Sequence, residues 1–225
     1  MSQGIGARVP LPILKYDVFL SFRGEDTRQF FTTKLHAMLQ QKGLATFIDN
    51  ERLMRGDVIS QGLLRAIEES LVSVVILSEN YASSTWCLDE LQKIIELRKE
   101  FGRAIFPVFY GVDPSEVRHQ RGSFEVAFAK YEEVYKGNRE KVRRWRDALA
   151  DVANTSGWDS REYSHDAELI QTIVEAVWIN LRPKIPSTIH MLQGVDTKVE
   201  DLDKEARIGL DKLYNTEIKC GCIIL

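Results

Sequence analysis

Cysteine is scarce in this sequence, and the three residues present are badly spaced for a disulfide framework. Cys87 stands alone, whereas Cys220 and Cys222 lie two residues apart near the end. A small disulfide-stabilised secreted domain is therefore excluded, and a reducing, intracellular compartment is expected.

Long apolar runs are also missing. No stretch approaches the roughly 18 apolar residues that a membrane-spanning helix needs, and MSQGIGARVPLPILK at the N-terminus lacks a sustained apolar run. The net charge of −3 favours neither nucleic acid nor an anionic surface as a partner, and the basic run at 141–146 is interpreted as a solvated helix face. At 225 residues, 44% of them hydrophobic, the chain can bury the core of one ordinary domain.

Several chemical motifs are absent as well. The sequence contains no GxxxxGK[ST] phosphate loop and no metal-ligand spacing, so no metal site is predicted. Its four histidines fit neither a Ser-His-Asp nor a Cys-His arrangement, and surface positions are expected for them (His36, His119, His165 and His190). Cys87 is interpreted as a small buried hydrophobic residue.

Apolar runs alternate with helical patterns through the first 181 residues. Strands are predicted at 16–22, 44–49, 72–78 and 104–112, with room for a short fifth within ANTSGW (153–158). Helices are predicted at 27–42, 59–70, 85–99, 123–136, 139–153 and 164–181. This alternation predicts an α/β fold with a parallel sheet and helices on both faces, in the flavodoxin-like doubly wound order 2-1-3-4-5.

The predicted organisation is a flexible segment at 1–13, a domain at 14–182, and a linker and tail at 183–225, where 195–213 has the pattern of a short charged helix. The last four residues, Cys222 to Leu225, fit a C-a-a-X prenylation box whose terminal Leu favours geranylgeranyl, and Cys220 is a candidate for palmitoylation. The alternative is an accidental tetrapeptide without modification.

In the predicted strand order, the chain reverses direction between the first and third strands, and ligands of such sheets bind beyond the strand ends at that point. These ends lead into FRGEDTR (22–28) and SENYASSTWCLDEL (78–91). Two charged, aromatic-bearing loops are therefore expected to converge at the favoured crevice.

Two adjacent carboxylates stand in what is predicted to be the first turn of the helix that follows the second of these loops. On a helical wheel Asp89 falls opposite the apolar stripe, so we expect it to be exposed and paired with Lys93. Glu90 shares the shoulder of that stripe with Trp86. The residues alone leave open whether Glu90 is functional or merely complements the helix dipole.

A single functional carboxylate would limit the chemistry. Hydrolysis of an ordinary glycoside takes two carboxyl groups, because the leaving group must be protonated. A nicotinamide nucleotide does not need this, because its leaving group already carries a positive charge and departs neutral. One anion that orients the ribose and stabilises an oxocarbenium-like transition state would then suffice.

Six motifs in sequence order carry a resemblance to a known family: YDVFLSFRGEDTR, GLATFIDN, RGDVISQGLLRAIEES, VVILSENYASSTWCLDEL, IFPVFYGVDPSEVRHQRGSF and VRRWRDALADVANTSGW. Together they resemble the signatures of a plant Toll/interleukin-1 receptor (TIR) domain, over roughly residues 14 to 182. The resemblance implies the flavodoxin-like fold and cleavage of NAD+ or NADP+, bound as a substrate rather than as a permanent cofactor. It also implies release of nicotinamide and of ADP-ribose-type signalling nucleotides in plant immunity.

The resemblance also implies site residues. The catalytic residue of the family matches Glu90, and the residues matching the walls of its nucleotide pocket are Phe22, Arg23, Ser84 and Trp86. The loop at 50–57, with Arg55 as its expected contact, would close over the pocket. For Arg23 the alternative is an ion pair with Glu25 or Asp26, and for Arg55 it is a solvated loop charge.

The partners implied are further TIR domains, through self-association and through other TIR-containing immune receptors, and lipase-like immune heterodimers that sense the products. One self-association surface of the family uses a Ser-His pair on the first helix, where this sequence has Thr33-Lys34. The tail resembles the segment leading into the nucleotide-binding domain of plant resistance receptors, so a truncated or TIR-only relative is expected. The expected location is the cytoplasm, with membrane contact if Cys222 is prenylated and with the nucleus not excluded.

Two functions follow for the same fold. The first is an NAD+ glycohydrolase that is active on self-association. The second is a non-catalytic TIR module that assembles with immune receptors or modulates them.

Overall fold

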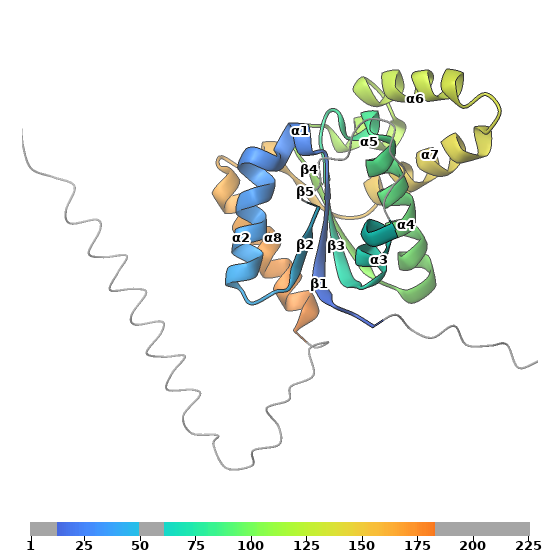
Figure 1. Ribbon diagram of the computed structural model, residues 1–225. Helices are drawn as coiled ribbons and strands as arrows, with labels where there is room; N and C mark the ends of the chain where they lie inside the picture. Colours follow the sequence, from blue (N-terminus) through green and yellow to red (C-terminus); the bar gives the residue numbers. More distant parts are fainter. Residues whose placement is uncertain (1–12, 50–60, 183–225) are drawn as a thin grey trace, which may run out of the picture. The chain divides into compact units, whose positions relative to one another are not determined.

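The computed structural model describes residues 13–49 and 61–182, which form one sheet with helices on both faces (Figure 1). The five strands are β1 (Tyr16–Phe22), β2 (Thr46–Ile48), β3 (Ser70–Leu77), β4 (Ala104–Phe109) and β5 (Trp158–Asp159). All pairs are parallel and the order is β2-β1-β3-β4-β5, as predicted. The fold is therefore the flavodoxin-like α/β arrangement expected from the sequence.

The centre of the sheet is made by β1 and β3, whose register places Leu20 beside Val74 and Phe22 beside Ile76. Both strands are continuous apolar runs because helices cover both of their faces. Side chains that point to one face join α2 (Thr33–Gln41) and α8 (Asp166–Leu181) in one core. Those on the other face pack against α3 (Gln61–Glu68), α4 (Thr85–Phe101) and α7 (Arg139–Ala153).

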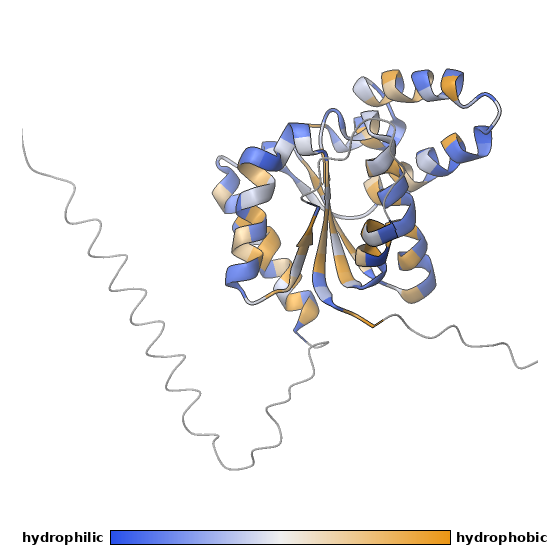
Figure 2. Cartoon of the chain, in the orientation of Figure 1, coloured by the Kyte–Doolittle hydropathy of each residue, from blue (hydrophilic) through white to orange (hydrophobic). Residues whose placement is uncertain are grey.

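The apolar faces of these helices turn toward the sheet and their charged faces point outward, as the hydropathy colouring shows (Figure 2). In α4 the predicted stripe is buried, with Leu88 and Leu91 fully inaccessible to solvent. The helix ends where Gly102 adopts a left-handed conformation, with φ of 67°.

The first helical segment differs from the prediction. It begins at Gly24 rather than at 27, and comprises α1 (Gly24–Thr27), a wide π-helical turn η1 (Arg28–Thr32) and then α2. The π turn leaves Phe30 with 67% of its surface exposed. The sequence pattern does not reveal a π turn inside a helix, so a single regular helix from 27 to 42 was predicted.

Two further helices pack in the same core as α3, α4 and α7: α5 (Pro114–His119) and α6 (Ser123–Val134). The short α5 was not predicted. Its signals are nevertheless in the sequence, because Asp113 accepts a hydrogen bond from the backbone N–H of Ser115 and Pro114 occupies the first turn. Six residues are too few to show a helical hydrophobic period.

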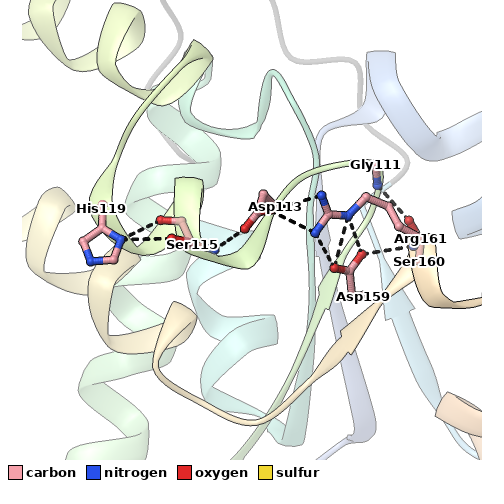
Figure 3. Close-up of polar contacts among 7 residues, drawn as sticks. All are labelled: Gly111, Asp113, Ser115, His119, Asp159, Ser160 and Arg161. Atoms are coloured by element: carbon pink, nitrogen blue, oxygen red, sulfur yellow. Dashed lines mark hydrogen bonds and ion pairs between the residues drawn. The ribbon is translucent and has the colours of Figure 1, made fainter.

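Arg161 fastens the carboxyl end of the last strand, from the turn η3 (Ser160–Glu162) (Figure 3). Its guanidinium donates to Asp159 at 2.6 Å and to Asp113 at 3.2 Å, so it joins β5 to the start of α5. The backbone N–H of Gly111 also donates to Ser160 Oγ at 2.8 Å. These contacts hold the two-residue β5 against β4.

Pro107 lies in the middle of β4, and the structure shows how the strand accommodates a residue that has no backbone N–H. β5 pairs only with Val108 and Phe109, so β4 lies at the edge of the sheet as far as Pro107. Gly157 lies directly against the Pro107 carbonyl: a Cβ at position 157 would come within 2.2 Å of that oxygen.

Within residues 13–49 and 61–182, no helix combines the length and apolar character needed to span a bilayer.

We predict that Gly157→Ala destabilises the protein by about 1–3 kcal/mol, because the added methyl group forces β5 away from the Pro107 carbonyl. Urea unfolding measures the change. Gly137→Ala is the matched control, since nothing lies within 4 Å of a Cβ at position 137. Equal stability of the two variants would contradict this packing.

Candidate active site at the carboxyl ends of β1 and β3

The two loops expected to meet at the reversal of the sheet do meet there, and Asp26 connects them. This carboxylate, in α1, accepts hydrogen bonds from Ser78 Oγ at 2.6 Å and from the backbone N–H of Asn80 at 3.0 Å. The segment after β1 is thereby tied to the segment after β3. The loops converge as predicted from the strand order.

Ser84 fixes the start of α4. Its Oγ accepts a hydrogen bond from the backbone N–H of Cys87 at 3.3 Å, so it is the N-cap and the helix begins at Thr85. Asp89 and Glu90 consequently lie in the second turn, not in the first as predicted. Because the field of a helix terminus fades within one turn, the dipole does not account for either carboxylate.

The prediction for Asp89 was wrong. Its carboxylate accepts a hydrogen bond from Trp145 Nε1 at 2.7 Å and lies 3.4 Å from Lys141 Nζ, both on α7. Lys93 pairs instead with Glu68 of α3 at 2.6 Å. Asp89 is therefore a partly buried link between α4 and α7.

Glu90 is buried, with 7% of its surface exposed, more deeply than its predicted position on the shoulder of the apolar stripe implied. Its Oε2 accepts a hydrogen bond from Ser21 Oγ at 2.8 Å, and Ser21 lies on the central strand β1. Within the described part of the chain this is the only hydrogen bond to the carboxyl group. The sheet thus holds one oxygen of Glu90.

Tyr81 extends this contact into a chain of hydroxyl groups. The residue belongs to the short helix η2 (Tyr81–Ser83), and its hydroxyl lies 2.9 Å from Ser21 Oγ and donates to the Cys87 carbonyl at 3.1 Å. Ser21 and Tyr81 are completely buried. Sequence reasoning missed both, although a serine inside the apolar strand YDVFLSF is itself a sign of a buried polar contact.

The pKa of Glu90 is raised from 4.5 to about 8, mainly by burial and to a smaller extent by the nearby Asp49 and Asp89 carboxylates, against the Ser21 hydrogen bond that lowers it. Burial likewise raises the pKa of the Cys87 thiol well above its usual range. Cys87 is thus the inert, buried side chain that the sequence predicted.

Arg23 forms the ion pair named as the alternative, donating to Glu25 at 2.6 Å. Its Nε is buried and has no hydrogen-bond partner among the described residues. The guanidinium therefore retains one N–H donor without a partner among the described residues, directly after the carboxyl end of β1.

Phe22 and Trp86 belong to the two elements that meet here. Phe22 is buried at the end of β1 and Trp86 is half-buried in the first turn of α4. Arg28, which sequence reasoning did not single out, stacks over the Phe22 ring at 4.8 Å and donates to the Asp49 carbonyl at 2.7 Å. Its position in FRGEDTR was the available signal.

Three expected site residues, Arg55, Cys220 and Cys222, lie outside the described residues, as do the tail and its predicted helix. Their proposed roles stay predictions. In the described part of the chain, no group of three or more acidic, histidine or cysteine side chains is arranged to hold a metal ion. A charged hollow of about 460 Å³ lies between α6 and α7, and no expected site residue lines it.

The profile of the TIR domain family matches residues 15–197, which include the whole sheet and its helices. The chain belongs to the TIR domain family. Disease resistance protein RPV1 of Vitis rotundifolia is 50% identical over 187 residues, 83% of this chain, and TMV resistance protein N of Nicotiana glutinosa is 44% identical over 196 residues, 87% of this chain. The match spans only 13% of the length of RPV1 and 17% of the length of N.

Among solved structures, the TIR domains of the activated Roq1 resistosome, which directly recognises the pathogen effector XopQ, are 50% identical to the chain. The two superpose with a TM-score of 0.66, over 72% of this chain and 99% of that one. This TIR domain is therefore of the kind found in plant disease resistance proteins.

We predict that Glu90→Gln stabilises the fold at pH 8 by about 4 kcal/mol and has little effect near pH 4.5. Between these values the folded protein keeps a proton on Glu90 that the unfolded chain has released. Its free energy of unfolding therefore falls as pH rises through this window and levels off above about pH 8.

Urea unfolding of both proteins from pH 4.5 to 8.5 measures this difference. Glu96→Gln is the control, because Glu96 is an exposed carboxylate on the same helix. A Glu90→Gln effect that does not change with pH would refute the raised pKa.

Proposed function

We propose that this TIR domain cleaves the N-glycosidic bond of NAD+ or NADP+, with Glu90 as the catalytic carboxylate. The observation that carries the proposal is the burial of Glu90 beside Ser21, at the reversal point of the sheet where this architecture binds ligands. A carboxylate kept in such a place against its desolvation cost is typical of a functional site.

The reaction needs only one such group. The bond between the ribose C1′ and the pyridinium nitrogen breaks, its electron pair leaves with neutral nicotinamide, and the ribose becomes oxocarbenium-like. The Glu90 carboxylate stabilises that positive charge. Water then adds to C1′ and its proton passes to the carboxylate and on to solvent, which gives ADP-ribose, nicotinamide and one proton.

The surrounding residues fit the binding of this substrate. The unmatched Nε–H donor of Arg23 suits an anionic or hydroxyl oxygen of a nucleotide. The half-buried Trp86 offers a flat surface for one of its rings. The cationic nicotinamide ring would itself favour the ionised form of Glu90, so that the substrate helps to charge its catalyst.

The relatives support a role for the proposed activity in plant immunity. Both named proteins are resistance proteins, and the Roq1 TIR domains belong to an activated resistosome. By analogy, this TIR domain acts in immune signalling, alone or with other TIR-containing receptors, and self-association activates it. Its ADP-ribose-type products would be sensed by lipase-like immune heterodimers.

A second function has an observation of its own. Phe30 in η1 and Ile179 on α8 are 67% and 59% exposed, on the helical layer formed by α2 and α8. Exposed apolar side chains of this kind favour contact with another protein. A non-catalytic interaction module would use this layer and would not need Glu90.

We predict that the 225-residue protein, at high concentration in a crowding agent, converts NAD+ to nicotinamide, and that Glu90→Gln lowers the rate at least about 100-fold. Chromatography of the nucleotides measures the conversion, and Glu96→Gln serves as the control. Equal rates for Glu90→Gln and the parent, or no conversion by either, would leave the interaction module as the function.

We also predict that kcat/KM for NAD+ rises with pH and is half-maximal near pH 8, because the ionised form of Glu90 is the active one. Initial rates at low NAD+ between pH 5.5 and 9 test this. A plateau already reached at pH 5.5 would show that another group, or none, controls the reaction.

A further inference from the structure

The buried hydroxyl groups of Ser21 and Tyr81 are not explained by packing alone. Each is completely inaccessible to solvent, and each lies within hydrogen-bond distance of the next member of a row that runs from Glu90 Oε2 to the Cys87 carbonyl. The Cys87 carbonyl lies within α4, so the helix ladder already provides it with a donor. The row therefore serves its other end, the carboxyl group.

The number of hydrogen atoms in this row depends on the state of Glu90. When the carboxyl is neutral, three hydrogens fill three contacts: Glu90 donates to Ser21, Ser21 to Tyr81, and Tyr81 to the Cys87 carbonyl. When it is ionised, Ser21 turns and donates to the carboxylate, and Tyr81 donates either to Ser21 or to Cys87. Both states leave Glu90 Oε2 hydrogen-bonded to the same strand.

The backbone also fixes the positions of the two hydroxyl-bearing residues in the row. Ser21 pairs with Val75 in the middle of the sheet, and Tyr81 follows Asn80, whose backbone N–H is bonded to Asp26. Neither hydroxyl needs a loop to order before it reaches its partner. The arrangement is preorganised.

We propose that Ser21 and Tyr81 are positioning residues for Glu90: they hold Oε2 to the sheet through a reversible row of hydroxyl hydrogen bonds and leave Oε1 for the substrate. The part concerning the substrate rests on the proposed NAD+ cleavage. The part concerning the carboxyl group does not.

The two hydroxyls act on Glu90 in opposite directions. Ser21→Ala removes the donor to the carboxylate, so the ionised state loses its charge-assisted bond and the pKa of Glu90 rises. Tyr81→Phe removes the acceptor that Ser21 uses when the carboxyl is neutral, so the Ser21 hydroxyl donates to Glu90 alone and the pKa of Glu90 falls. A purely structural role predicts no such opposition.

The test measures where Glu90 titrates, from the pH dependence of the free energy of unfolding. Each variant of the 225-residue protein is compared with the same variant carrying Glu90→Gln, from pH 4.5 to 10. The charged or titratable groups around Glu90 are present throughout, so their effects cancel: Arg23, Asp26, Asp49, Tyr81 (except in Tyr81→Phe), Cys87 and Asp89.

Above the pKa of Glu90 in the folded protein, this carboxyl group no longer makes the free energy of unfolding depend on pH. We expect this upper edge to move up by about one pH unit in Ser21→Ala and down by about 0.5 unit in Tyr81→Phe. Two matched controls remove a comparable hydroxyl elsewhere. Ser70→Ala loses a buried bond to the Ala66 carbonyl, and Tyr110→Phe loses a bond to the Asp166 carboxylate. Neither should move the edge.

Shifts in the same direction, or no shift, in Ser21→Ala and Tyr81→Phe would overturn the proposal. The same variants are then assayed for NAD+ cleavage, where the apparent pKa of kcat/KM should follow the two shifts. If the pKa of Glu90 shifts in opposite directions in the two variants, but neither they nor the parent protein cleaves NAD+, the positioning role is supported and NAD+ cleavage is rejected. Turnover with an unshifted pH profile would reject the positioning role and leave NAD+ cleavage standing.

Discussion

The site depends on a single contact, the hydrogen bond from Ser21 on the central strand to the buried carboxyl group of Glu90. Burying a carboxylate costs free energy, and one hydroxyl donor offsets only part of that cost. The protein therefore holds Glu90 in an environment that favours its neutral form, although the proposed chemistry needs the anion. In the proposed reaction the substrate would resolve this conflict, because its cationic ring beside Glu90 would favour the ionised state.

The rest of the fold holds the two sides of this contact in register. Ser21 is fixed by the pairing of β1 with β3, and Glu90 by α4, whose start is set by Ser84. Asp26 joins the two loops across the reversal of the sheet, while Asp89 ties α4 to Trp145 of α7. Each of these polar side chains uses its hydrogen bonds to position a segment of the fold. Stability and site geometry are consequently linked through α4.

Much of this arrangement could be predicted from the sequence. The strands and the burial of the apolar stripe of α4 follow from hydrophobic periodicity, which is a local signal. The strand order and the convergence of the two loops follow from the doubly wound fold that the alternation of strands and helices predicts. Asp89 was wrongly predicted to be exposed, because a helical wheel considers only residues of the same helix. Its partner Trp145 lies 56 residues away in the sequence. Ser21 and Tyr81 were missed for the same reason, since their partner Glu90 is brought to them only by the fold. The π turn and α5 are too short or too irregular for periodicity to detect.

The central claim is that Glu90 is a buried carboxyl group whose proton is retained near neutral pH. Its most direct test is a ¹³C NMR titration of the side-chain carboxyl carbons in protein labelled at glutamate, with Glu90→Gln to assign the signal. The account predicts that Glu90 titrates near pH 8. A midpoint near 4.5, the ordinary value for glutamate, would contradict it.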